Sequence, residues 1–88
     1  MGPAGVTPVA YQTGTHLDTY TSTGVYINER NADARAELGW PTQKAALLLV
    51  FALGNFVYQM CMDHWDGSFY VRARYAGTWR PWRTFVQK

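Results

Sequence analysis

The dipeptide Gly54-Asn55 separates two apolar runs and limits the possible folds more than any other feature of the chain. The run before it, residues 45–53, is continuously apolar, and the run after it, residues 56–62, is rich in β-branched, aromatic and other large side chains. Gly-Asn is a favoured pair in two-residue hairpin turns. The sequence therefore predicts an antiparallel hairpin in which Leu53 lies opposite Phe56 and Leu47 lies opposite Met62.

Two further turn signals, residues 63–67 and 76–78, extend this hairpin into a meander with strands at 68–75 and 79–86. We expect Met62 to pair with Ser68. Because side chains alternate between the faces of a strand, this register puts Arg72 and Arg74 on the face of Leu47. The predicted fold class is all-β, a small antiparallel meander sheet.

Both faces of the predicted sheet are largely apolar, and each such face needs a cover. The chain has 88 residues, and one this short buries only roughly 60–65% of the surface that it exposes when unfolded. Residues 24–28 predict one more strand, and residues 31–38 predict two helical turns that begin at Asn31 and end before Gly39. The chain alone lacks material for both covers, so we expect neighbouring copies to complete the sheet.

Composition excludes several classes of protein. The single cysteine, Cys61, rules out an internal disulfide and a cysteine-based zinc site. No apolar run approaches the roughly 20 residues of a membrane-spanning helix, so we expect no membrane insertion, and the N-terminus does not have the pattern of a signal peptide. Aromatic residues make up 16% of the chain and charged residues 16%, which is unlike a disordered protein.

Several motifs in residues 17–86 are similar to those of the knob domain of bacteriophage tail fibres and pyocin fibres. They are the opening stretch 17–20 with Gly-x-Tyr at 24–26, the strand 56–62 with Gln59 at its centre, Tyr-x-Arg-x-Arg at 70–74, and Gly-x-Trp-x-x-Trp at 77–82. The resemblance implies a knob-like β domain completed by homotrimer packing. It also implies a location in a virion tail fibre and partnership with other tail fibre or baseplate proteins. Residues 1–17 would form an extended lead-in or linker to the fibre shaft, and residues 18–88 the knob.

Tail fibre knobs recognise host surfaces, so the resemblance implies attachment to a bacterial surface glycan of the lipopolysaccharide kind. The candidate ligand-binding residues are His64, Trp65 and Asp66, because Trp65 stands at a hairpin tip among polar residues. Arg72 and Arg74 are further candidates, since guanidinium groups bind anionic glycans. Solvated arginines, or arginines paired across a subunit boundary, remain the alternative interpretation.

Gln59, Trp79 and Trp82 are the predicted core and assembly residues. Gln59 is polar in an apolar face, so it needs hydrogen-bond partners, which a threefold ring or a backbone carbonyl would supply. Pro81 cannot donate to a central ladder, and a bulge there would bring Trp79 and Trp82 to one side. The alternative to a receptor-binding knob is therefore a purely structural module that trimerises and registers the fibre.

The sequence predicts no enzyme, no metal site and no cofactor. Asp63 and Asp66 are the one close pair of carboxylates, but they occupy a single turn, where aspartates bond their own backbone. Residues 1–66 carry a charge of −3 and residues 67–88 carry +5. The arginines of this second stretch alternate with aromatics, a pattern compatible with single-stranded nucleic acid. A net charge of +2 gives little electrostatic attraction to nucleic acid, so we expect no nucleic-acid partner.

Overall fold

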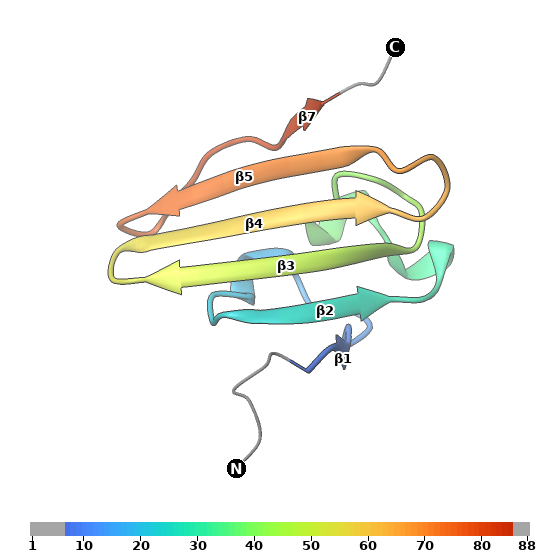
Figure 1. The fold of residues 1–88 in the computed structure, drawn as a ribbon, viewed down its shortest axis with the longest axis horizontal. Helices are drawn as coiled ribbons and strands as arrows, with labels where there is room; N and C mark the ends of the chain where they lie inside the picture. The colour runs from blue at the N-terminus through green and yellow to red at the C-terminus, as the bar shows by residue number, and fades with distance from the viewer. Residues whose placement is uncertain (1–6, 86–88) are drawn as a thin grey trace.

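The computed structural model describes residues 7–85, which form one sheet with three single-turn 3₁₀ segments (Figure 1). The strand order is β1-β2-β3-β4-β5-β6, with β7 also paired to β5, and every pairing except β1 with β2 is antiparallel. The prediction of an all-β meander is confirmed. The strands are β1 (Val9–Ala10), β2 (Gly24–Asn28), β3 (Ala46–Leu53), β4 (Phe56–Asp63), β5 (Phe69–Tyr75), β6 (Thr78–Trp79) and β7 (Arg83–Phe85).

The hairpin of β3 and β4 has the predicted register along its whole length. Leu53 pairs with Phe56 and Leu47 with Met62. Gly54 adopts a φ of 61°, a left-handed conformation that glycine takes without steric cost. The two-residue turn therefore fixes which side chains of both strands share a face.

The predicted register between β4 and β5 is wrong by one residue. Met62 pairs with Phe69 rather than with Ser68, so Gln59 pairs with Arg72 and Val57 with Arg74. A slip of one position moves every side chain of a strand to the other face. Arg72 and Arg74 consequently lie on the face of Gln59, and not on the face of Leu47.

One face of the sheet, here called the inner face, carries the core. Its fully buried side chains include Leu48, Val50, Gln59 and Cys61. They are covered by segments that lie mostly behind the sheet in Figure 1. The covering side chains come from far apart in the chain: Tyr11, Leu17, Tyr20, Ala34, Leu38, Trp40, Trp79 and Trp82.

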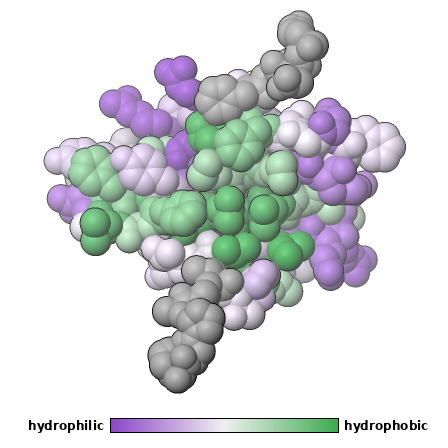
Figure 2. Space-filling view, in the orientation of Figure 1, coloured by the Kyte–Doolittle hydropathy of each residue, from purple (hydrophilic) through white to green (hydrophobic). Residues whose placement is uncertain are grey.

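The opposite face, here called the outer face, has no cover in the part of the chain that the structure describes. Leu53 is 86% exposed there, and Figure 2 shows hydrophobic side chains gathered across this side of the molecule. The expectation that one chain cannot cover both faces agrees with this arrangement. The other large, exposed apolar side chains of the outer face are Ile27, Phe51, Phe56, Tyr58, Met62 and Tyr75.

Residues 31–38 do not form the predicted helix. They form two separate 3₁₀ turns, η2 (Asn31–Asp33) and η3 (Ala36–Leu38), because so short a helix does not recover the cost of its nucleation. The side chain of Asn31 accepts a hydrogen bond from Ala45 N instead of capping a helix. Gly39 ends the second turn with a φ of 92°, as expected of a terminating glycine.

The described part of the predicted lead-in packs against the sheet. Strand β1 pairs with β2, Tyr11 is buried, and Leu17 opens η1 (Leu17–Thr19) with no exposed surface. The sequence interpretation missed this packing because the segment has no apolar periodicity. Residues 1–6 of the predicted lead-in lie outside the described residues. No helix in residues 7–85 is long and apolar enough to span a membrane.

Candidate functional site

The turn between β4 and β5 is rigidly bonded by its own aspartates. Asp63 accepts a hydrogen bond from Asp66 N at 3.1 Å, and Asp66 accepts two from Ser68, from the hydroxyl at 2.7 Å and from the backbone N–H at 3.0 Å. Those bonds from Ser68 lower the pKa of Asp66. Asp63 also accepts a bond from the Thr42 hydroxyl at 3.1 Å. Both carboxylates are therefore engaged in hydrogen bonds that stabilise the turn.

Trp65 projects from this turn and is 69% exposed. The Lys44 ammonium lies 4.8 Å from the centre of its ring, within the range of a cation–π contact. The His64 ring meets it edge-on, with 6.3 Å between the ring centres. The three predicted ligand residues of the turn, His64, Trp65 and Asp66, are thus neighbours at one end of the sheet.

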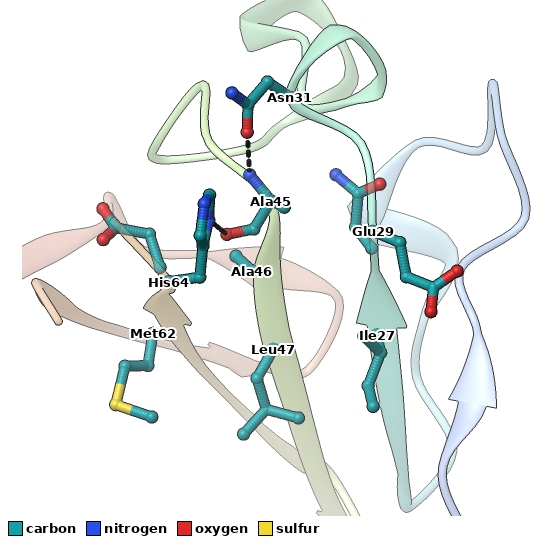
Figure 3. A pocket seen from close by; sticks show the side chains of 10 residues that line it. Ile27, Glu29, Asn31, Ala45, Ala46, Leu47, Met62 and His64 are labelled. Atoms are coloured by element: carbon teal, nitrogen blue, oxygen red, sulfur yellow. Dashed lines mark hydrogen bonds between the residues drawn. The ribbon is translucent and has the colours of Figure 1, made fainter. Parts of the chain in front are cut away.

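A pocket of about 630 Å³ opens beside this turn, between the ends of β2, β3 and β4 (Figure 3). Ile27, Leu47 and Met62 give it an apolar floor that continues the outer face. Glu29, Asn31 and His64 give it polar walls. The sequence interpretation did not find Glu29 and Asn31. Their position depends on the pairing of β2 with β3, which places the end of β2 beside the β4–β5 turn.

Arg72 lies away from this turn, on the inner face, and its side chain is only 7% exposed. Its guanidinium is 3.9 Å from the ring centre of Trp79 and 4.7 Å from that of Trp82. Nη2 donates to Asp18 at 2.9 Å. Burial lowers the pKa of Arg72, and the charge of Asp18 opposes that effect. The side chain is committed to contacts within the domain, so a surface ligand would have to displace them. Arg74 is half-buried on the same face, near the hairpin end of β4.

Gln59 satisfies its amide within its own chain. Nε2 donates to the carbonyls of Leu17 and Tyr20 at 2.8 and 2.9 Å, and Oε1 accepts from Arg72 at 2.8 Å. The sequence left two possible partners for Gln59, a threefold ring and a backbone carbonyl. The structure contains backbone carbonyl partners. Trp79 and Trp82 both contact the guanidinium of Arg72, and the chain between them leaves the sheet between β6 and β7, at Pro81.

In residues 7–85, no group of three or more His, Cys, Asp or Glu side chains is arranged to hold a metal ion. Cys61 is buried on the inner face of β4, and burial, followed by the charge of Asp63, raises the pKa of its thiol to about 12. A thiol with so high a pKa is a poor nucleophile and a poor metal ligand at neutral pH.

No protein-family model matches the chain, and no curated protein matches it. Solved structures do. An N-truncated R2-type pyocin tail fibre is 31% identical with a TM-score of 0.84, and the match covers 97% of this chain and 34% of that one. The C-terminal part of the R1 pyocin fibre of P. aeruginosa is 27% identical with a TM-score of 0.83, covering 98% of this chain and 23% of that one. The C-terminal part of the R2 pyocin fibre of P. aeruginosa is 31% identical with a TM-score of 0.84, and the match covers 97% of this chain and 23% of that one.

The fold and these matches together define a domain of phage and pyocin tail fibres, as the sequence resemblance predicted. More particularly, the chain is similar to R-type pyocin fibres over nearly its whole length. Its location is accordingly the tail of a virion or virion-like particle. The chain spans between about a quarter and a third of the length of the fibres that it matches.

Proposed function

We propose that this domain is a homotrimeric knob that attaches a tail fibre non-covalently to a glycan on the bacterial surface. The observation that carries the attachment is the β4–β5 turn, which holds Trp65 out from the domain on a hydrogen-bonded base. A rigid exposed indole offers a large contact area at a low cost in conformational entropy. Its flat face packs well on the apolar face of a sugar ring.

The outer face supports the proposed trimer. Contiguous exposed apolar patches of this kind are rare on monomers and mark interaction surfaces. Phe56, Tyr58 and Tyr75 form an aromatic cluster at its hairpin end, where Phe56 lies 6.3 Å from Tyr58 and 4.9 Å from Tyr75 between ring centres. Three copies that bury the hairpin ends of these faces against one another would cover the aromatic cluster, which their own chains leave exposed. They would also give three weak glycan contacts the benefit of avidity.

In the assembled fibre, residues 1–17 would lead from the shaft into the knob, with their described part packed against the sheet. Other tail fibre or baseplate proteins would be the partners of the domain. We assign the domain no catalysed reaction. A second function rests on the same outer face: the domain could trimerise and register the fibre while another domain binds the host. In that case the turn at Trp65 would be inert.

The two functions are separated by measuring assembly and attachment on the same variants. Light scattering should give a mass near three times the 10.0 kDa of one chain. A Trp65→Ala trimer should lose binding to bacterial cells and to purified lipopolysaccharide. Leu53→Lys places a charge in the outer face and should give monomers. A wild-type protein that is a stable monomer contradicts the trimer, and a Trp65→Ala trimer that binds cells normally favours the purely structural function.

A further inference from the structure

We propose that the pocket beside the β4–β5 turn is a subsite for a single saccharide ring, whose hydroxyl groups would form hydrogen bonds with Asn31 and His64. This inference rests on the proposed glycan attachment and names a site for it. The pocket has the volume, the apolar floor and the few fixed polar groups that are typical of small-molecule sites. Its polar walls were not part of any sequence expectation except for His64.

The backbone N–H and carbonyl of Ala45 orient the side chains of Asn31 and His64 (Figure 3). The N–H of Ala45 donates to Asn31 Oδ1 at 2.7 Å, and the carbonyl of Ala45 lies 3.1 Å from His64 Nδ1. An N–H can only donate, so the oxygen of the Asn31 amide faces Ala45 and its Nδ2 remains a donor. A carbonyl can only accept, so Nδ1 of His64 carries the proton and Nε2 of the neutral ring is an acceptor.

The pocket therefore presents one fixed donor and one fixed acceptor on either side of Ala45. A hydroxyl group both donates and accepts, so two neighbouring hydroxyls of a sugar ring match this pair. Below them, Ile27, Leu47 and Met62 form a floor for the apolar face of the ring. Ile27 and Met62 are already exposed, so binding would remove apolar surface from water.

A further polar side chain at the pocket has no partner of its own. Glu29 is exposed and makes no hydrogen bond or ion pair within the described residues. Its carboxylate can accept from a further hydroxyl.

The subsite and the proposed assembly surface occupy opposite ends of the outer face. Leu47 lies at the pocket and Leu53 at the aromatic end of the same strand, six residues away. At about 3.3 Å per residue, this separates them by roughly 20 Å. Copies that pack through the aromatic end can therefore leave the pocket open to solvent.

The test is an NMR titration of the assembled, ¹⁵N-labelled protein with glucose, mannose and N-acetylglucosamine. At least one of these sugars should produce saturable shifts at the amides of Asn31, Ala45 and His64. Asn31→Asp keeps the acceptor for Ala45 N but replaces the donor by a carboxylate oxygen, and it should weaken binding about tenfold or more. The same chemical change at the distant turn, Asn55→Asp, should leave the affinity unaltered.

Met62→Lys provides a second, independent variant because it puts an ammonium into the apolar floor, and it should abolish the shifts. The inference is overturned if no sugar shifts the pocket amides, or if Asn31→Asp binds as tightly as Asn55→Asp. Binding to cells separates it from the function on which it rests. Pocket shifts without any attachment to cells would contradict the attachment function, whereas attachment that is equal in Asn31→Asp and Asn55→Asp would contradict only the subsite.

Discussion

Arg72 donates a 2.8 Å hydrogen bond from Nε to Oε1 of Gln59 on the neighbouring strand, in the middle of the inner face. Both residues then reach out of the sheet. Gln59 donates to the carbonyl of Leu17, and Arg72 donates to Asp18. This pair therefore links the sheet by polar contacts to the segment around η1 that covers it.

Removing either member of this pair should cost far more than the hydrogen bond between them. Gln59→Leu leaves the Tyr20 carbonyl and Arg72 Nε without partners and removes one of the two hydrogen bonds to the Leu17 carbonyl. We expect the free energy of unfolding to fall by about 3 kcal/mol. Arg72→Met should have a comparable effect because it removes the hydrogen bonds to both Gln59 and Asp18. Urea unfolding of both single variants and the double variant should give a coupling energy of about 1–3 kcal/mol. Strict additivity would show that the two side chains act independently.

Two glycines should respond differently to the same substitution. Gly54 and Gly39 both have positive φ values, 61° and 92°. An added Cβ at Gly54 meets nothing within 4 Å, whereas one at Gly39 would lie 3.0 Å from Cε1 of His16. Gly54→Ala should therefore cost only the backbone term, about 1 kcal/mol. Gly39→Ala should cost more, because the His16 ring must also move. Thermal unfolding of the two variants checks the order, and an equal loss would mean that the ring moves freely.

Cys61 should make the stability of the domain depend on pH in the alkaline range. Its pKa of about 12 in the folded state is raised from an ordinary value near 9. Above pH 9 the unfolded chain releases the thiol proton and the folded chain keeps it, so stability is lost as the pH rises from 9 towards 12. The loss is about 1.4 kcal/mol per pH unit.

The measurement is the difference in alkaline slope between the wild type and Cys61→Ala, since both retain the same tyrosines. The free energy of unfolding of Cys61→Ala should change less with pH over this range. The native thiol should also resist alkylation at neutral pH until urea unfolds the protein. Fast alkylation of the folded protein would contradict the burial of Cys61.

The two tryptophans beside Arg72 should not be equivalent. Trp82 Nε1 donates a 2.8 Å hydrogen bond to the carbonyl of Gly39, and Trp79 contacts Arg72 through its ring face. Phenylalanine retains a ring but has no donor, so Trp82→Phe leaves that carbonyl unpaired and should cost about 1 kcal/mol more than Trp79→Phe. Chemical denaturation of both proteins provides the comparison. The reverse order would show that stacking on the cation outweighs the hydrogen bond.

The part of the fold that could be predicted from sequence is the part that local signals determine. Gly54-Asn55 is a two-residue turn, and such a turn fixes the register of its strands, so the β3–β4 pairing was predicted correctly. The next turn is longer, and it closes through Asp63 N and Ser68 O with bonds between the Asp66 and Ser68 side chains. Nothing in its sequence sets its length, and the predicted register was one residue out.

The cover of the inner face could not be predicted for a different reason. Its segments have no apolar periodicity, and contacts over 39 to 54 residues hold them in place. The position of Trp65 at an exposed tip followed from its polar neighbours. The pocket could not be predicted in this way. Asn31 and His64 are brought together by their contacts with Ala45, and these contacts depend on a strand pairing that no local sequence pattern predicts.

The span of the Asp18–Arg72 contact also has a consequence for synthesis on the ribosome. The two residues are 54 positions apart, and Gly39 and Trp82 are 43 apart. A nascent chain that has emerged only as far as β4 already contains the Gly54-Asn55 hairpin, but it lacks the guanidinium and the indoles that secure the covering layer. At that stage the cover of the inner face is not yet secured and the outer face is bare, which is the state in which chains aggregate or recruit chaperones. Folding of each copy must therefore wait for the arrival of Trp82, and assembly between copies follows from there.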